Sequence, residues 1–225
     1  LTQAPPYSSQ PTPRNPPPAR RLTLVSCNAC CKKSLAQFFR LVPRADILAV
    51  NEIGVAESVF REAARRAQWV PVVVATCPRT DHASVARSAV LIRQMGPTYA
   101  LTTDTFASAC FSDIRAHPGT IRVISVYVPC NSGGAEMEAL GRWIYATAKR
   151  SPHEVVIAGD FNTRTSPLVE AVVRSLRYRE LVRGRTTFMR ADVRSSLDRV
   201  FIRPAANIIM ASPCFNSKRK KKQRT

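Results

Sequence analysis

The feature that most constrains the fold is an apolar run that stops abruptly on polar residues, Val155-Val156-Ile157-Ala158-Gly159-Asp160-Phe161-Asn162. A short apolar run bounded by turn residues predicts a buried strand. Because strand side chains alternate between faces, we expect Asp160 and Asn162 to point the same way from the end of that strand. Both side chains offer oxygen and Asn162 also offers donors, which suits a metal or a phosphoryl group. An ordinary Asp/Asn turn would explain the same residues.

The charge of the chain favours a polyanionic partner. Its 225 residues, 45% of them hydrophobic, suffice for one domain with a buried core. The 34 Lys+Arg against 15 Asp+Glu give a formal net charge of +19. Such a field attracts nucleic acid first and an acidic membrane surface second. We therefore expect DNA, or alternatively RNA, as the partner, with no membrane helix, no signal peptide and no obligate protein partner.

Biased composition marks both ends of the sequence. Residues 1–21 are dense in Pro, Ser and Arg and predict a disordered, extended linker. The run Lys218–Arg224 predicts a basic disordered tail over 213–225. That tail could be a nuclear-localisation signal, a DNA-holding segment or merely solvated charge. We expect the folded domain over 22–212, in an intracellular and, from the tail, nuclear protein.

The cysteines favour reduced thiols. There are seven, an odd number, and they lie in apolar surroundings. Cys27, Cys30 and Cys31 form a CxxCC group, but no second pair stands at zinc-ribbon spacing. We therefore expect no structural zinc.

Between the two ends, strand and helix patterns alternate in a way typical of an α/β or α+β fold with mixed sheets. Four segments are predicted to be helices. The helices are expected at 33–41, 56–68, 135–149 and 167–176. Strands are expected at 22–26, 46–50, 70–75, 86–93, 105–114, 121–128, 155–158, 197–202 and 207–211.

Four further predicted strands begin or end on polar residues. Asn28 follows Leu24-Val25-Ser26-Cys27, and Glu52 follows Ile47-Leu48-Ala49-Val50-Asn51. Tyr127 ends another apolar run, and Asp198 begins the last. Strand ends meet where sheets give way to loops, so these groups could share one cleft. Carboxylates gathered there would repel one another unless a hard cation such as Mg²⁺, with Mn²⁺ as a substitute, neutralised them.

These residues, in this order, carry a resemblance to a known family. Asn28, Asn51-Glu52, Tyr127-x-Pro129, Gly159-Asp160-Phe161-Asn162 and Ser195-x-x-Asp198 resemble the endonuclease/exonuclease/phosphatase superfamily. The match covers nearly all of residues 22–203. Thr187-Phe188 resembles the LINE-type retrotransposon branch more than the repair branch. The resemblance implies a four-layer sandwich of two packed mixed β-sheets flanked by helices, as in deoxyribonuclease I.

The resemblance also implies a role for each matched residue. Glu52 would be the main Mg²⁺ ligand, with Asn28 helping to hold the metal site. Asp160 would orient or deprotonate the attacking water, Asn162 would bind the scissile phosphate, and Tyr127 would contact that phosphate or help the leaving oxygen. Asp198 would orient the family's catalytic histidine. The further substrate contacts would be Asn131, Thr187 and Ser195.

The chain departs from the family pattern at one catalytic position. The family closes with a Ser-Asp-His segment, where this sequence has Ala211-Ser212-Pro213-Cys214 and then the basic tail. The sequence has three histidines, His82, His117 and His153, and none of them occupies the family's position. Two hypotheses therefore stand. One is a Mg²⁺-dependent endonuclease that nicks DNA, with apurinic-site cleavage as a side activity; the other is a catalytically weakened nucleic-acid-binding module. A small-molecule phosphatase is disfavoured because a small substrate does not require a charge of +19.

Overall fold

The computed structural model describes residues 22–29, 35–41, 45–78, 84–96, 98–116, 119–129, 133–162, 167–181, 188–190, 193–195 and 198–203. Within them lie two large mixed sheets and one small sheet. The predictions of a linker over 1–21, a basic tail over 213–225 and a strand over 207–211 fall outside the described residues, as do Asn131 and Thr187.

The first large sheet has four strands in the order β1-β2-β4-β3. Strands β1 and β2 are parallel, whereas β4 runs antiparallel to both β2 and β3. Helices α1 and α2 lie in the same half of the sequence. The bounds are β1 Leu24–Asn28, α1 Leu35–Leu41, β2 Ile47–Asn51, α2 Glu57–Arg66, β3 Trp69–Pro78 and β4 Ser84–Arg93.

The second large sheet has six strands in the order β5-β6-β7-β8-β12-β9. Strands β7 and β8 are parallel, and β12 pairs antiparallel with β8. The bounds are β5 Tyr99–Phe106, β6 Ala109–Ala116, β7 Gly119–Tyr127, α3 Gly134–Lys149, β8 Glu154–Asp160, α4 Pro167–Leu176, β9 Arg179–Glu180 and β12 Asp198–Ile202. A separate two-stranded sheet joins β10 Phe188–Arg190 to β11 Val193–Ser195.

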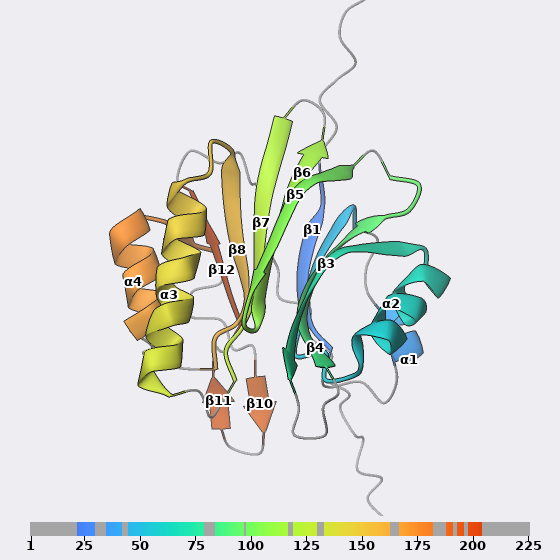
Figure 1. Ribbon diagram of the computed structural model, residues 1–225, viewed down its shortest axis with the longest axis horizontal. Helices are drawn as coiled ribbons and strands as arrows, with labels where there is room; N and C mark the ends of the chain where they lie inside the picture. The colour runs from blue at the N-terminus through green and yellow to red at the C-terminus, as the bar shows by residue number, and fades with distance from the viewer. Residues whose placement is uncertain are drawn as a thin grey trace, which may run out of the picture.

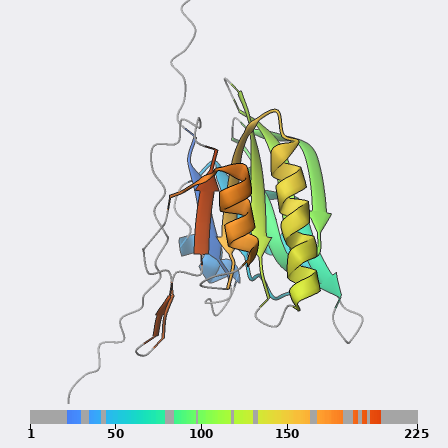
Figure 2. The same ribbon diagram turned by 90° about the vertical axis from the view of Figure 1, so that its left-hand side faces the viewer.

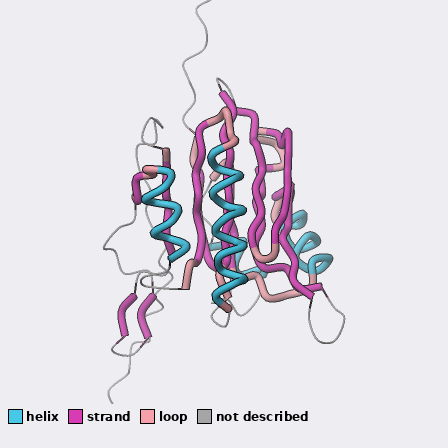
Figure 3. The backbone as a smooth tube through the Cα atoms, turned by 60° about the vertical axis from the view of Figure 1, so that its left-hand side comes forward, coloured by secondary structure: helices cyan, strands magenta, loops and turns pink. Residues whose placement is uncertain are grey.

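The two large sheets pack face to face, and helices cover their outer faces (Figure 1). Helices α1 and α2 bury Phe38, Phe39 and Phe60 against the four-stranded sheet. Helices α3 and α4 cover the six-stranded sheet, side by side in the turned view (Figure 2). The tube drawing shows the same pair of helices in front of the long strands (Figure 3). The predicted four-layer sandwich is therefore confirmed, and helices cover each sheet because each has a second apolar face to bury.

Most predicted elements are present, with ends shifted by a few residues. The helix Pro167–Leu176 has the predicted bounds. The predicted strand over 105–114 is present as β6 from Ala109 but begins too early, because the chain turns back at Ala107 and Ser108 and residues 105–106 belong to β5. Ala107 has φ of 48°, a left-handed conformation that glycine or asparagine usually marks in sequence. None of the helices in the described residues is long and apolar enough to cross a membrane.

Candidate active site

The space between the two sheets is apolar along most of its length and becomes polar at one end. Ile47, Ala49, Val156 and Ala158 belong to the apolar part. Side chains two positions apart share a face of a strand. The next inward position after Ala49 is therefore Asn51, and the next after Ala158 is Asp160. The parallel strands β7 and β8 bring Tyr127 into register with Asp160 at the same end.

Asn28 connects the two sheets at this polar end. Its Nδ2 donates to Glu52 Oε2 at 2.5 Å and to Asp160 Oδ2 at 3.1 Å. Asn28 ends β1 and Glu52 follows β2, both of the four-stranded sheet, whereas Asp160 ends β8 of the six-stranded sheet. One amide nitrogen thus holds two carboxylates from different sheets. Asp160 is buried, with 4% of its surface exposed, while Asn28 and Glu52 are half-buried.

Glu52 has an unusual backbone conformation. Its φ is 52°, in the left-handed region that a residue with a Cβ adopts at a cost. The turn is fixed because Ile53 N donates to Arg87 O at 3.3 Å and Gly54 N donates to Ala86 O at 2.9 Å. Such conformations persist where the surroundings impose them, and they concentrate at functional sites. Here the turn aims the carboxylate at Asn28.

The Asp160–Asn162 sequence forms the Asp/Asn turn that was one of its two interpretations. Asn162 N donates to Asp160 Oδ1 at 2.9 Å, the local bond of an Asp/Asn turn, while Asp160 Oδ2 accepts from Asn28. The expectation that strand alternation aligns Asn162 with Asp160 is wrong, because β8 ends at Asp160 and Asn162 has φ of 48°. Instead, Asn162 Nδ2 donates to Val128 O at 2.6 Å. That bond holds the amide beside the end of β7.

The remaining predicted residues are placed to different extents. Tyr127 is buried at the end of β7, and Asp198 begins β12 directly opposite Asp160 in the antiparallel pair. Ser195 ends β11, in the small sheet that pairs with neither large sheet. For Asp198 and Ser195 the structure describes the backbone alone. It therefore brings together Asn28, Glu52, Tyr127, Asp160 and Asn162, and places Asp198 by its strand register.

The donor set suits a hard cation with few protein ligands. In the described part of the chain, no three His, Cys, Asp or Glu side chains gather as a metal cage. Glu52 and Asp160 nevertheless supply two carboxylates on either side of one carboxamide. Mg²⁺ is commonly held by one or two carboxylates and keeps several waters, so these residues fit it better than they fit zinc.

Nucleophilic chemistry does not suit two of the described thiols, those of Cys77 and Cys110. Burial raises the pKa of the Cys110 thiol to about 12. Burial also raises the pKa of Cys77, against the lowering effect of the neighbouring Arg87 guanidinium. Both groups therefore stay protonated at neutral pH, and a protonated thiol is a poor nucleophile.

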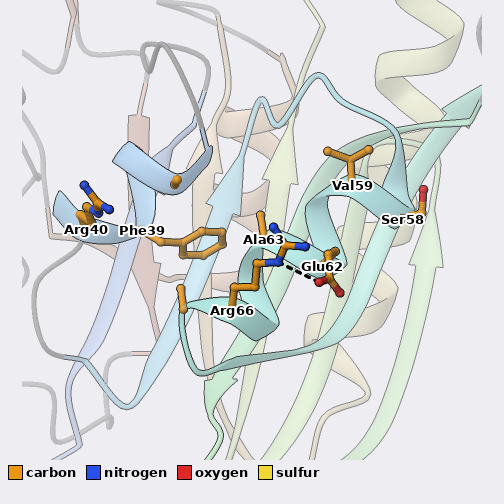
Figure 4. A pocket seen from close by; sticks show the side chains of 9 residues that line it. Phe39, Arg40, Ser58, Val59, Glu62, Ala63 and Arg66 are labelled. Carbon is orange, nitrogen blue, oxygen red and sulfur yellow. Dashed lines mark hydrogen bonds and ion pairs between the residues drawn. The ribbon is translucent and has the colours of Figure 1, made fainter.

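Two surface hollows lie away from the polar end. One, of about 720 Å³, separates α1 from α2 and is lined by Phe39, Val59 and Ala63 with Arg66 beside Glu62 (Figure 4). The other, of about 580 Å³, lies between α3 and α4. The charged side chains of the first hollow include an exposed ion pair, Arg66 Nε to Glu62 Oε1 at 2.9 Å. Neither hollow includes a residue of the candidate site.

The polar residues behind the site have no role that the sequence predicts. Asn51, Ser88, Ser108 and Ser125 are buried and join the two sheets by hydrogen bonds. A signal was present, since Ser88 and Ser125 occupy inward positions of strands that are otherwise apolar there. Single small polar residues in a strand are common, however, so the pattern is visible only once the two sheets face each other.

Comparison with known proteins identifies the fold. No protein-family model and no curated protein matches the sequence. Among solved structures, a humanized D. rerio TDP2 is 15% identical, with a TM-score of 0.59 over 85% of this chain and 86% of that one. The endonuclease domain of TRAS1, a telomere-specific non-LTR retrotransposon, is 14% identical, with a TM-score of 0.59 over 81% and 85%.

A third similar structure broadens the range of chemistry on this fold. The mannosyl-6-phosphatase Bt3783 of Bacteroides thetaiotaomicron is 9% identical, with a TM-score of 0.64 over 82% of this chain and 86% of that one. At these identities the likeness concerns the fold. The chain therefore has the endonuclease/exonuclease/phosphatase fold that the family resemblance implied.

Proposed function

We propose that this chain is a Mg²⁺-dependent phosphodiesterase that nicks DNA and leaves a 3′-hydroxyl and a 5′-phosphate. The observation that carries the proposal is the amide of Asn28, which holds Glu52 of one sheet and Asp160 of the other at 2.5 and 3.1 Å. Tyr127 ends β7, and Asn162 follows the end of the neighbouring strand β8. Two carboxylates that can hold Mg²⁺ and activate water, beside side chains that can donate to a phosphate, suit the hydrolysis of a phosphodiester.

In this proposal Glu52 is the main Mg²⁺ ligand, and Asn28 keeps the two carboxylates in place. A bound Mg²⁺ would supply Lewis-acid polarisation of the phosphoryl group. Asp160 orients the attacking water and accepts its proton; its burial and its bond from Asn162 N fix the carboxylate plane. Mn²⁺ would substitute, because it also prefers oxygen ligands.

Asn162 and Tyr127 would contact the scissile phosphate. One hydrogen of the Asn162 amide is used by Val128 O at 2.6 Å, so the second can donate to a phosphate oxygen. Tyr127 would donate its phenolic hydrogen to the phosphate or to the leaving oxygen. The resemblance implies further substrate contacts at Asn131, Thr187 and Ser195. It implies a positioning role for Asp198.

Charge supports nucleic acid as the substrate. The net charge of +19 favours a polyanion over a sugar phosphate, even though a mannosyl-6-phosphatase shares the fold. Another D. rerio TDP2 structure of the same fold holds a single-stranded DNA product. The TRAS1 domain supports a retrotransposon-type endonuclease. Apurinic-site cleavage is a side activity that the family resemblance implies. RNA is the alternative polymer, and a nuclear location would follow from the basic tail.

One observation favours a second candidate, a nucleic-acid-binding module with weakened catalysis. In the part of the chain that the structure describes, the single histidine is His153. It precedes β8, whereas Asp160 ends that strand. Six strand intervals separate β8's first and last residues, or about 20 Å. His153 therefore cannot serve at Asp160, and loss of the family's catalytic histidine would cost orders of magnitude in rate.

Nicking of supercoiled plasmid by the full chain tests the proposal, with Mg²⁺ against EDTA. Asp160→Ala should lower nicking by about 100-fold or more, because it removes the general base. Glu154→Ala is the matched control, since Glu154 is an exposed carboxylate at the other end of β8. Nicking that needs Mg²⁺ and fails only in Asp160→Ala supports the nuclease. No nicking, with salt-sensitive DNA binding retained, supports the binding module instead.

A further inference from the structure

The polar end of the inter-sheet space extends behind the candidate active site. Asn51, Ser88 and Ser125 are each 0% exposed, so their side chains lie wholly within the protein. Asn51 and Ser88 stand opposite each other on β2 and β4 of the four-stranded sheet. Ser125 lies on β7 of the six-stranded sheet. These groups therefore face one another across the two sheets.

The first contact joins Asn51 to Ser125. The Ser125 hydroxyl donates to Asn51 Oδ1 at 2.9 Å and lies 3.2 Å from Val50 O. Asn51 immediately precedes Glu52, and Ser125 stands two residues before Tyr127 on the same face of β7. The bond thus ties the strand that ends at the proposed metal ligand to the strand that ends at the proposed phosphate contact.

The second contact joins Ser88 to Ser108. The Ser88 hydroxyl donates to Ser108 O at 2.8 Å. That same carbonyl accepts from Tyr127 N at 3.2 Å, and the Ser108 hydroxyl donates to the Tyr127 carbonyl. The backbone of Tyr127 is therefore bonded on both its N–H and its C=O to a residue that β4 holds in place.

Stability alone does not explain the polar residues. Asn51 Nδ2 is buried and has no hydrogen-bond partner among the described residues. An unpaired buried donor is destabilising, whereas an apolar pair of similar shape would pack without that cost. Hydrogen bonds, unlike apolar contacts, fix direction and distance. Directional contacts beside the site are expected where its geometry matters.

We infer that Asn51 and Ser125 are positioning residues, which fix the position of Glu52 relative to Tyr127 and Asp160. Ser88 and Ser108 are positioning residues for the backbone of Tyr127. The inference rests on the proposed function and names part of the machinery that supports it. Groups that act through a ligand or catalytic residue typically change activity or metal affinity by about 10- to 100-fold when they are removed.

The test replaces the Asn51–Ser125 bond by an apolar pair, in the double variant Asn51→Leu/Ser125→Ala. The matched control is Ser112→Ala, which removes a buried hydroxyl of β6 that donates a long hydrogen bond, 3.5 Å, to Asp113 O. Plasmid nicking is measured across Mg²⁺ concentrations, and Mg²⁺ binding is measured by calorimetry. Chemical unfolding reports the stability of each protein.

We expect the double variant to be as stable as Ser112→Ala, to nick DNA about 10- to 100-fold more slowly, and to need more Mg²⁺ for half-maximal rate. DNA affinity in EDTA should not change, because it depends on surface charge. Wild-type nicking and Mg²⁺ dependence in the double variant would overturn the inference and leave the proposed function standing. Wild-type protein that shows no Mg²⁺-dependent nicking would overturn the proposed function, and the inference with it.

Discussion

Glu52 and Asp160 accept hydrogen bonds from the same nitrogen, Nδ2 of Asn28, although they belong to different sheets. Without a cation, the amide is the neutral group that separates two carboxylates. Hydrogen bonds to charged groups contribute more than neutral ones, and two like charges at this separation repel each other. The stability of this end of the molecule should therefore depend on Asn28 and on Mg²⁺ together.

Asn28→Ala should lower the free energy of unfolding by about 2 kcal/mol in EDTA, because two charged acceptors lose their shared donor. Mg²⁺ should restore part of that loss, since a ligand that binds the folded state stabilises it by mass action. Urea unfolding in EDTA and in excess Mg²⁺ measures both effects. Equal stability of the variant and the wild type in EDTA would show that the amide does not hold the carboxylates.

Gly159 is the second point at which the site depends on backbone geometry. It pairs in register with Val126 of β7, and a Cβ at this position would lie 1.9 Å from Val126 O. That contact is with backbone, which cannot rotate away as a side chain can. Gly159→Ala should therefore lower the free energy of unfolding by about 3 kcal/mol or more, because overpacking against backbone is among the most destabilising kinds of substitution.

The matched control for Gly159→Ala is Gly119→Ala. A Cβ at Gly119, which begins β7, would meet no atom within 4 Å. Thermal unfolding should place Gly119→Ala close to the wild type and Gly159→Ala far below it. A small effect at Gly159 would mean that β7 and β8 separate easily, which would contradict the tight parallel pairing beside Asp160.

The β5–β6 hairpin shows why part of the fold could not be predicted. Ala107 has φ of 48°, and the sequence Phe106-Ala107-Ser108-Ala109 contains no glycine, proline or asparagine to mark a turn. Ala107→Gly should raise the free energy of unfolding by about 0.5–1 kcal/mol, because glycine adopts this conformation without strain. Ala109→Gly should lower it by a similar amount, since Ala109 is buried in β6. Chemical unfolding of both variants checks the opposite signs.

The candidate site was predictable where residues act through their place at a strand end. Periodicity placed Asn28, Glu52, Tyr127 and Asp160 at strand termini, and the family resemblance that these residues carry implied the fold. The inter-sheet contacts were not predictable, because Ser88 and Ser108 are adjacent only after the two sheets pack. The sequence left open whether Asn162 continues the strand or belongs to an Asp/Asn turn, because strand alternation does not encode the local bond from Asn162 N to Asp160 Oδ1.

The last prediction concerns alkaline stability. Cys110 is fully buried between the sheets, and burial raises the pKa of its thiol from 9.0 to about 12. Between these values the unfolded chain has lost the proton and the folded chain retains it, so raising the pH favours unfolding. The contribution of the protonated Cys110 thiol to the free energy of unfolding is fully present below pH 9 and is lost as the pH rises toward 12. At pH 10 the loss amounts to about 1.4 kcal/mol relative to pH 8.

Cys110→Ala isolates this effect from the titration of other groups. The difference in free energy of unfolding between wild type and Cys110→Ala should shrink by about 1.4 kcal/mol between pH 8 and pH 10, in reducing agent throughout. Urea unfolding at both pH values measures it. A difference that stays constant would mean that the thiol titrates alike in the folded and unfolded chains, and that the space between the sheets admits water at Cys110. Water there would also weaken the contact between the sheets in which the Ser88 hydroxyl oxygen lies 3.6 Å from the Cys110 sulfur.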